Sequence, residues 1–456
     1  MGADTGDTIS ATLRPKASRL SLTWAAWFLS RLRAVGRRVT GLYWSLRGRF
    51  RVVISGPLGL LAVAQAAPVP VYALLSLLTV VILSPARRGE ASLIVGSASI
   101  GGTLVFGSMH VGAVMAVHGR DVRAVARVIC ITLGLSVICL VVGALCWVYP
   151  SFGIGLYRGR VAGQCLLGVG LTVPFLFATR TLQGLGLARS FSRLMLLQVA
   201  VYFTATTTCL VVLNWRSPLA ITIPWLGATA LALIPAAVGL ARLLSNVPWR
   251  DVTVDRRVNS IMASLAAHGG SSSQQLGYRA DLFLLGAFAS ASSIGYYSVA
   301  TAMAEIVWVV PEVIALSVFA DERVRAGAQW GRVVDRRIRQ AIQISAIVGL
   351  AVVAGAAVLL LVALPRYADS FPLLLMLLPG IVASASARVT LAALTARDER
   401  RLISLGSAAT LAVACLYVPA IALGGVAGAA MGSTVIYIGG FALAHQLWKK
   451  AKTCTT

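Results

Sequence analysis

The chain has 456 residues, of which 58% are apolar and 12% are charged. Soluble globular chains average about 45–50% apolar and about 25% charged residues, so this chain lacks the polar surface for a water-soluble body of its size. Its apolar stretches are long enough to cross a hydrocarbon layer of ~30 Å as helices. These proportions exclude a cytosolic enzyme, a secreted disulfide scaffold and a nucleic-acid-binding domain, and they predict an all-α polytopic membrane protein.

The net charge of +25 comes from 40 basic and 15 acidic residues. In a soluble protein this excess would indicate binding to nucleic acid. Here the basic residues lie next to the apolar stretches, as the positive-inside rule describes. We therefore expect membrane lipids, and no nucleic acid, among the partners.

Residues 1–57 form a basic N-terminal tail without an apolar run long enough to span a membrane. Aromatic and arginine residues alternate between Ser18 and Phe50, which is typical of a helix lying in the membrane interface against anionic lipid. A solvated tail that only enforces orientation fits the pattern equally well, so both interpretations stay open.

Twelve apolar segments follow the tail, and we expect each to be a transmembrane helix. They lie at approximately 58–83, 92–117, 125–148, 162–179, 191–213, 218–241, 259–286, 292–319, 339–364, 371–395, 402–421 and 424–447. The expected organisation is a first six-helix bundle at 58–241, a linker at 242–258, a second six-helix bundle at 259–447 and a basic C-terminal tail at 448–456.

The basic residues also give an orientation. With the N-terminus inside, the cytoplasmic segments hold 32 Lys and Arg, whereas the outer loops hold 6. This asymmetry predicts that both termini are cytoplasmic. The chain has 36 Arg and 4 Lys with abundant Ala, Gly and Val, which we interpret as a GC-rich bacterial genome. The expected location is therefore the bacterial cytoplasmic (inner) membrane.

An internal repeat relates the two expected bundles. The segment that begins at Gly89 (GEASLI) is matched 206 residues later by the segment that begins at Gly295 (GYYSVA). Thr181-Leu182 is matched in the same way by Thr390-Leu391. Since six is an even number of spans, two such halves are parallel and related by an axis along the membrane normal.

No enzyme signature is present. The chain has no Gly-Lys dipeptide and hence no P-loop, and it contains neither an HExxH motif nor a GxSxG elbow. The seven cysteines have no metal-ligand spacing. We expect no catalytic residues, no metal and no cofactor.

Span seven carries the most informative polar residues. Polar groups facing lipid cost several kcal/mol unless they are paired, so this stretch faces protein or a water-filled cavity. Gln65 lies in span one, the positional counterpart of span seven. The expected substrate-binding residues are Arg279, Ser272, Gln274, Gln275 and Gln65.

Carboxylates within the spans are candidate sites for a coupling ion, which is either H⁺ or Na⁺. The candidates are Glu305, Asp281 and Glu312; the two glutamates are seven residues apart and so are expected on one helix face, and Pro311 predicts a kink in that span. The alternative is a Glu–Arg or Glu–Ser pair that only locks span eight to span seven. We expect Arg388 to extend to the membrane interface. Arg87, Arg88 and Glu90 are expected to be solvated at the outer mouth.

Short motifs in both halves share a pattern with one family. They are Leu83–Gly89 (LSPARRG), Tyr278–Leu285 (YRADLFLL), Ser292–Ala300 (SSIGYYSVA) followed by Glu305 and Pro311, Leu378-Pro379-Gly380, and Gly425–Ala430. With these motifs the chain, over about residues 58–447, resembles the oligosaccharide and polysaccharide (O-antigen-type) flippases of the multidrug/oligosaccharidyl-lipid/polysaccharide (MOP) exporter superfamily.

The resemblance implies two six-helix bundles splayed in a V, as in the MATE branch of that superfamily, around a cavity lined by spans one, two, seven and eight. It implies alternating access that moves a polyprenyl-diphosphate-linked oligosaccharide from the inner to the outer leaflet for cell-surface polysaccharide synthesis. Polysaccharide polymerase and assembly proteins are then candidate partners. Two alternatives stay open: a multidrug cation antiporter of the same superfamily, and a membrane scaffold that transports nothing.

Overall fold

The computed structural model describes most of the chain from Pro68 onward. The described residues are 68–106, 108–149, 151, 153–248, 264, 276, 279–320, 330–397, 412–413 and 415–453, with the backbone alone at 68, 69, 316, 319, 320, 452 and 453. Residues 60–456 form one compact unit. The expected N-terminal tail at 1–57 and most of the expected linker at 242–258 lie outside the described residues.

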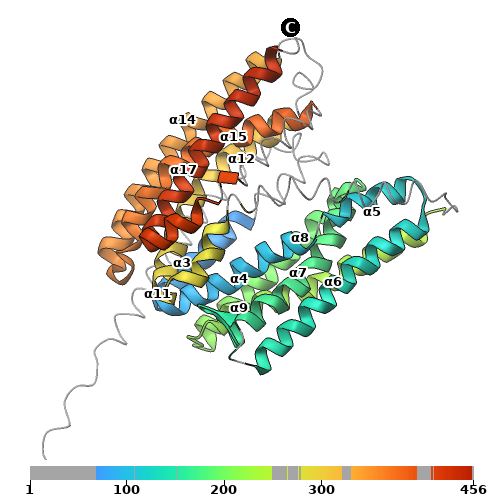
Figure 1. Ribbon diagram of the computed structural model, residues 1–456, viewed down its shortest axis with the longest axis horizontal. Helices are drawn as coiled ribbons and strands as arrows, with labels where there is room; N and C mark the ends of the chain where they lie inside the picture. The colour runs from blue at the N-terminus through green and yellow to red at the C-terminus, as the bar shows by residue number, and fades with distance from the viewer. Residues whose placement is uncertain are drawn as a thin grey trace, which may run out of the picture. The chain divides into compact units, whose positions relative to one another are not determined.

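The first half is helical apart from one short hairpin (Figure 1). Its helices are α3 (Pro68–Ile82), α4 (Pro85–Phe106), α5 (Met109–His118), α6 (Val122–Val148), α7 (Arg160–Gly184), α8 (Ala188–Thr207) with the π-helical turn η1 (Thr208–Val212), and α9 (Leu219–Ser245). The antiparallel strands β1 (Gly153–Ile154) and β2 (Tyr157–Arg158) join α6 to α7.

Among its described residues, the second half consists of helices joined by short turns. Residues 279–288 are helical. They are followed by α11 (Ala291–Glu305), the 3-10 turn η2 (Ile306–Trp308), α12 (Val309–Ala320), α14 (Trp330–Ala356), the π-helical turn η3 (Ala357–Ala363), the 3-10 turn η4 (Pro365–Tyr367), α15 (Ser370–Ala396) and α17 (Tyr417–Thr453). Gly425 has a positive φ of 54° and divides α17 into two helical pieces.

The expected all-α membrane fold is confirmed. Among the described residues, nine helices are long and apolar enough to cross a membrane, and two shorter apolar helices accompany them. Several helix ends differ from the expected span ends. Span two was expected from 92 and α4 begins at Pro85, and span nine was expected from 339 and α14 begins at Trp330. The first turns of α14 are amphipathic, with Trp330 and Val334 buried beside the basic Arg332 and Arg336, and a hydropathy pattern detects only the apolar part of such a helix.

Small residues let the helices within each half approach closely. In the first half α7 packs against α4, α6 and α9. A Cβ atom added to Gly163 would lie 2.8 Å from the carbonyl oxygen of Gly143 on α6. In the second half α15 packs against α14 and α17, and a Cβ on Gly380 would lie 2.6 Å from Cα of Thr434. Such contacts are how membrane helices gain packing energy when lipid is as apolar as their own side chains.

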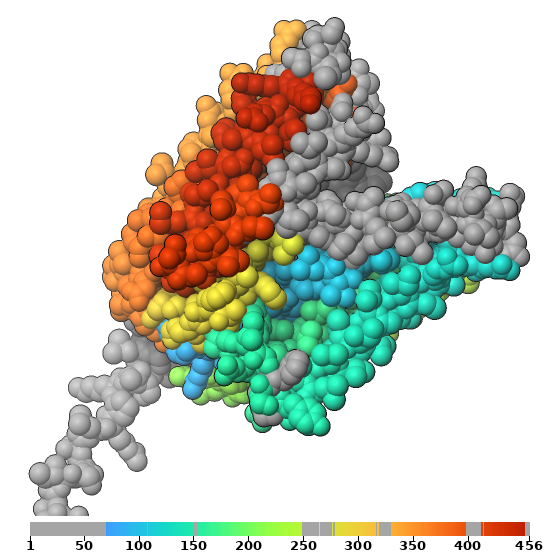
Figure 2. Space-filling view, in the orientation of Figure 1, coloured from blue at the N-terminus to red at the C-terminus, as the bar shows by residue number. Residues whose placement is uncertain are grey.

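The two halves meet along α4 and α11, and this contact follows the internal repeat. A Cβ on Gly89 would overlap the carbonyl oxygen of Ala291, and a Cβ on Gly295 would overlap that of Pro85. The repeat offset relates Gly89 to Gly295 and Pro85 to Ala291, so α4 presents to α11 the same surface that α11 presents to α4. Figure 2 shows α11 between the helices of the first half and the remaining helices of the second.

Pro311 breaks span eight, as its position predicts. A proline has no N–H group to bond the carbonyl four residues earlier, which here belongs to Val307. The 3-10 turn η2 occupies Ile306–Trp308 at that point and separates α11 from α12. The break turns Glu305 and Glu312 toward different partners.

Arg88 does not lie in solvent as expected. It is 4% exposed, and its guanidinium donates to the side chains of Ser76, Thr79 and Ser298 and to the carbonyl oxygen of Ser76 at 2.8 Å. These partners lie on α3 and α11, so Arg88 joins three helices across the two halves. The expectation was wrong because a charged residue at the end of a span turns inward when neighbouring helices offer acceptors.

Replacing Arg88 by alanine should destabilise the folded protein by about 3 kcal/mol, because several buried acceptors lose a charged donor. Thermal unfolding of the purified protein in detergent measures the effect. Arg87→Ala is the matched control, since Arg87 is exposed and donates only to the carbonyl oxygen of Arg216 at 2.7 Å among the described contacts. Equal melting temperatures for the two variants would contradict the role given to Arg88.

Candidate functional site

A small pocket lies among helices of the second half. Its lining combines ionic groups, aromatic rings and aliphatic side chains: Arg279, Asp281, Leu282, Tyr297, Thr301, Glu305, Trp308, Leu377, Ile381 and Tyr437. The ionic groups come from the helical residues 279–288 and from α11, whereas α15 and α17 supply apolar and aromatic surface. Most of the pocket is thus built from spans seven and eight.

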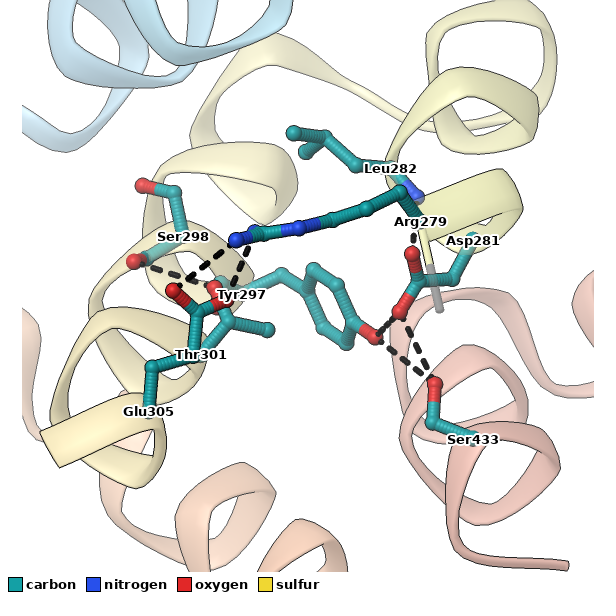
Figure 3. Close-up of polar contacts among 8 residues, drawn as sticks. All are labelled: Arg279, Asp281, Leu282, Tyr297, Ser298, Thr301, Glu305 and Ser433. Atoms are coloured by element: carbon teal, nitrogen blue, oxygen red, sulfur yellow. Dashed lines mark hydrogen bonds and ion pairs between the residues drawn. The ribbon is translucent and has the colours of Figure 1, made fainter. Parts of the chain in front are cut away.

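Arg279 and Glu305 form a bidentate ion pair in this pocket (Figure 3). The Nη1–Oε1 distance is 2.6 Å and the Nη2–Oε2 distance is 3.0 Å. The side chains are 40% and 28% exposed, so the pair can be reached from the pocket. A guanidinium held in this fork geometry presents the two parallel donors that also suit a phosphate group.

Asp281 lies two residues from Arg279 and has different partners. It is 4% exposed and accepts hydrogen bonds from the hydroxyls of Tyr297 and Ser433, the latter at 2.8 Å, and from the backbone N–H of Leu282 at 2.7 Å (Figure 3). Tyr417 donates to Ser433 at 3.0 Å. The carboxylate therefore ties span seven to α11 and α17, and three donors already surround its oxygens.

A second ion pair lies beyond the pocket along span eight. Arg388 on α15 contacts Glu312 at 2.6 Å, and its guanidinium lies 4.3 Å from the ring centroid of Trp308. The indole Nε1 of Trp308 donates to Ser384 at 2.8 Å. The expectation that Arg388 extends to the interface was wrong, because a carboxylate and an aromatic face within the bundle hold it instead.

Of the predicted site residues, Arg279, Asp281 and Glu305 come together in the pocket, and Glu312 lies outside its lining. Ser272, Gln274, Gln275 and Gln65 lie outside the described residues, as does much of the expected cavity between spans one, two, seven and eight. Sequence reasoning did not select Tyr297, Tyr437 and Ser433. Their signal was a polar atom on an otherwise apolar span, which is too common to single out one residue.

Within the described part of the chain, no cluster of three or more His, Cys, Asp or Glu side chains is placed to hold a metal ion.

No protein-family model matches the chain, and no curated protein matches its sequence. Several solved structures match its fold. A MOP superfamily transporter from Pyrococcus furiosus has a TM-score of 0.52 and 14% identity over 88% of this chain and 96% of that one. The lipid II flippase MurJ in an inward closed conformation has a TM-score of 0.62 and 11% identity over 84% of this chain and 86% of that one.

A MATE transporter in its straight conformation has a TM-score of 0.52 and 15% identity, covering 88% of this chain and 97% of that one. The three structures are transporters or flippases of several spans, and each is matched over most of its own length. Identities this low show the fold alone. The described part of the chain has the fold of the MOP superfamily transporters.

Proposed function

We propose that the protein is a flippase for an anionic lipid-linked oligosaccharide, carried on a polyprenyl diphosphate from the inner to the outer leaflet. The observation that carries the proposal is the Arg279–Glu305 fork, an accessible guanidinium pre-formed for a bidentate anion. One protein of the same fold is described as a lipid II flippase.

The charges of the first half support an anionic substrate. Between residues 68 and 248, the described helices that are long enough to cross a membrane contain one carboxylate. It is Glu90, which lies close to the start of α4. An organic cation bound in that half would lack a counter-charge at mid-membrane. A diphosphate needs cationic or donor-rich surroundings, which Arg279 supplies from span seven.

Glu305 gives this site a means of ion coupling. While Glu305 is ionised it occupies both donor positions of Arg279. A proton on Glu305 removes the competing charge and frees Arg279 for the diphosphate, and loss of that proton restores the pair and expels the anion. Asp281 is an anchor in this scheme, because its oxygens are already held by Tyr297, Ser433 and the backbone of Leu282.

Orientation follows from the basic residues. The described residues of the loops at 83–84, 149–159, 213–218, 289–290 and 364–369 lie at one end of the helices, which we name the hairpin end, and the hydrogen bond from Tyr367 to Leu83 joins the two halves there. The few basic residues at this end support an outer location for it, with both termini facing the cytoplasm of a bacterial inner membrane.

The multidrug antiporter alternative has one observation in its favour. Trp308, Tyr297 and Tyr437 line the pocket, and aromatic faces bind organic cations. In that reading Glu305 would be the cation's partner, yet it is already paired with Arg279. An organic cation would have to displace the guanidinium of Arg279 from Glu305, whereas an anionic substrate would bind that guanidinium.

The test is lipid extraction from a strain in which this chain is deleted, with mass spectrometry of what accumulates. We expect a polyprenyl-diphosphate oligosaccharide that a membrane-impermeant periodate reagent cannot oxidise in intact spheroplasts, because it stays on the inner leaflet. Re-expression of the chain should clear it. Sensitivity to cationic drugs without such a lipid would overturn the proposal in favour of the antiporter.

A further inference from the structure

Two loops at the hairpin end bind the opposite half of the protein. The first joins α6 to α7, contains the strands β1 and β2, and carries Tyr157. The second joins η3 to α15, contains η4, and carries Tyr367. The internal repeat makes the two loops counterparts of one another, since each follows the third span of its half.

The first loop reaches from the first half to the helical residues 279–288. The hydroxyl of Tyr157 donates to the carbonyl oxygen of Phe283 at 2.8 Å, and the backbone N–H of Leu156 donates to that of Gly286 at 2.8 Å. Gly155 has a φ of 54°, and a Cβ there would lie 2.6 Å from the Gly286 carbonyl oxygen. Only a glycine lets the loop approach this closely without strain.

The second loop makes the reciprocal contacts with α3. The hydroxyl of Tyr367 donates to the carbonyl oxygen of Leu83 at 3.0 Å. The guanidinium of Arg366 donates to the carbonyl oxygens of Val80, at 2.8 Å, and Val81. The repeat offset that relates Gly89 to Gly295 also relates Val80 to Gly286, so equivalent carbonyls at the ends of spans one and seven receive a donor from the opposite half.

The carbonyls of Val80, Val81 and Gly286 need such donors for a local reason, because they belong to the last four residues of their helices. The last four carbonyl groups of a helix have no partner within the helix. Burial also raises the pKa of both Tyr157 and Tyr367 above the ordinary value, so each hydroxyl stays protonated and remains a donor at physiological pH. The donors cross from one half to the other, and any opening at the hairpin end has to break them.

We propose that Tyr157 with Leu156, and Tyr367 with Arg366, form two reciprocal clasps that close the hairpin end and set how often the two halves separate there. The clasps are gating residues of the transport cycle and contact no substrate. The gating role in transport rests on the proposed function. The closure of the hairpin end does not, because it is present in the protein without substrate.

Spin labels on either side of the first clasp test the proposal. The seven native cysteines are removed, and cysteines that carry the labels replace the exposed Arg158 and Phe288. Double electron–electron resonance then gives the distribution of distances between the two labels in liposomes without substrate. We expect one short distance in the parent. Tyr157→Phe and Tyr367→Phe should each raise the ratio of long to short distances about fivefold, and together about 25-fold.

Two further variants keep the result interpretable. Arg366→Met removes a donor of the second clasp at an exposed position, so it replaces Tyr367→Phe as the test if the substitution of the buried Tyr367 prevents folding. It should shift the distances in the same direction as Tyr367→Phe. Tyr149→Phe is the matched control, because Tyr149 is 62% exposed at the same end. An unchanged distribution in the folded double variant, or an equal shift with Tyr149→Phe, would overturn the proposal. Since no substrate is present, a failed flippase assay leaves this result standing.

Discussion

Arg279→Gln should abolish flipping of the lipid-linked glycan, by a factor of about 100 or more, while the protein stays in the membrane. Bidentate charge-assisted hydrogen bonds are worth about 1.5–3 kcal/mol each, and the variant loses both. Flipping is measured in proteoliposomes, where a labelled polyprenyl-diphosphate oligosaccharide becomes accessible to an external glycosidase. Binding of the same lipid to the purified protein should fall by a similar factor.

Glu305→Gln should act in the opposite direction on binding. The neutral amide no longer competes for the guanidinium of Arg279, so the lipid-linked diphosphate binds more tightly, and transport stops because release needs the ionised carboxylate. A lock between spans seven and eight would predict weaker binding in both variants. The charge swap Arg279→Glu with Glu305→Arg also distinguishes the two roles. It restores an ion pair between spans seven and eight, but it moves the guanidinium to span eight. A lock would therefore be restored, whereas the substrate site would not.

The second ion pair supplies a matched control. Arg388→Gln removes an equally short contact, to Glu312, from outside the pocket lining. Flipping should then change by less than about threefold, since neither Arg388 nor Glu312 lines the pocket and Arg388 contacts the lining through the ring of Trp308. Loss of transport in Arg388→Gln as large as in Arg279→Gln would contradict the assignment of the site to the pocket.

The sequence predicted well what depends on hydropathy and charge along one helix. Long apolar stretches specify membrane helices because only closed backbone hydrogen bonding is stable in lipid. Arg279 and Asp281, the two charged residues predicted within span seven, line a pocket, and the kink before Pro311 follows from one missing N–H group. Such inferences need no knowledge of the neighbouring helix.

What the sequence could not predict depends on which neighbour a side chain meets. Arg88 lies beside a span end and Arg388 toward the cytoplasmic half of span ten, and either position fits a solvated side chain as well as a buried one. Glu305 and Glu312 lie on the same expected span, but the turn η2 separates them and gives each its own arginine. Pairing of this kind is decided by the packing of separate spans.

The repeat carried more information than either half alone. Its offset related Gly89 to Gly295 in the sequence, and the structure places both at the contact between α4 and α11. The same offset relates Val80 to Gly286 at the two clasps. In a pseudo-symmetric contact, each repeat motif packs against its counterpart in the other half. The same motif, present once in each half, therefore forms both sides of the interface.

Gly89→Ala and Gly295→Ala should therefore destabilise the protein by similar amounts, about 3 kcal/mol each. In both variants the added methyl group overlaps a backbone carbonyl oxygen, of Ala291 and of Pro85, and a backbone cannot rotate away as a side chain can. The helices α4 and α11 must separate. Thermal unfolding of the purified protein in detergent measures the loss.

Gly134→Ala in α6 and Gly355→Ala in α14 are the matched controls, because a Cβ at either position meets no atom within 4 Å. These changes should be neutral or stabilise by about 0.5–1 kcal/mol through helix propensity. The double variant of Gly89 and Gly295 should lose less than the sum of the single losses, since the first methyl group has already separated the helices that the second would push apart. Full additivity would mean that the two glycines act at independent contacts, and the pseudo-symmetric interface would then be wrong.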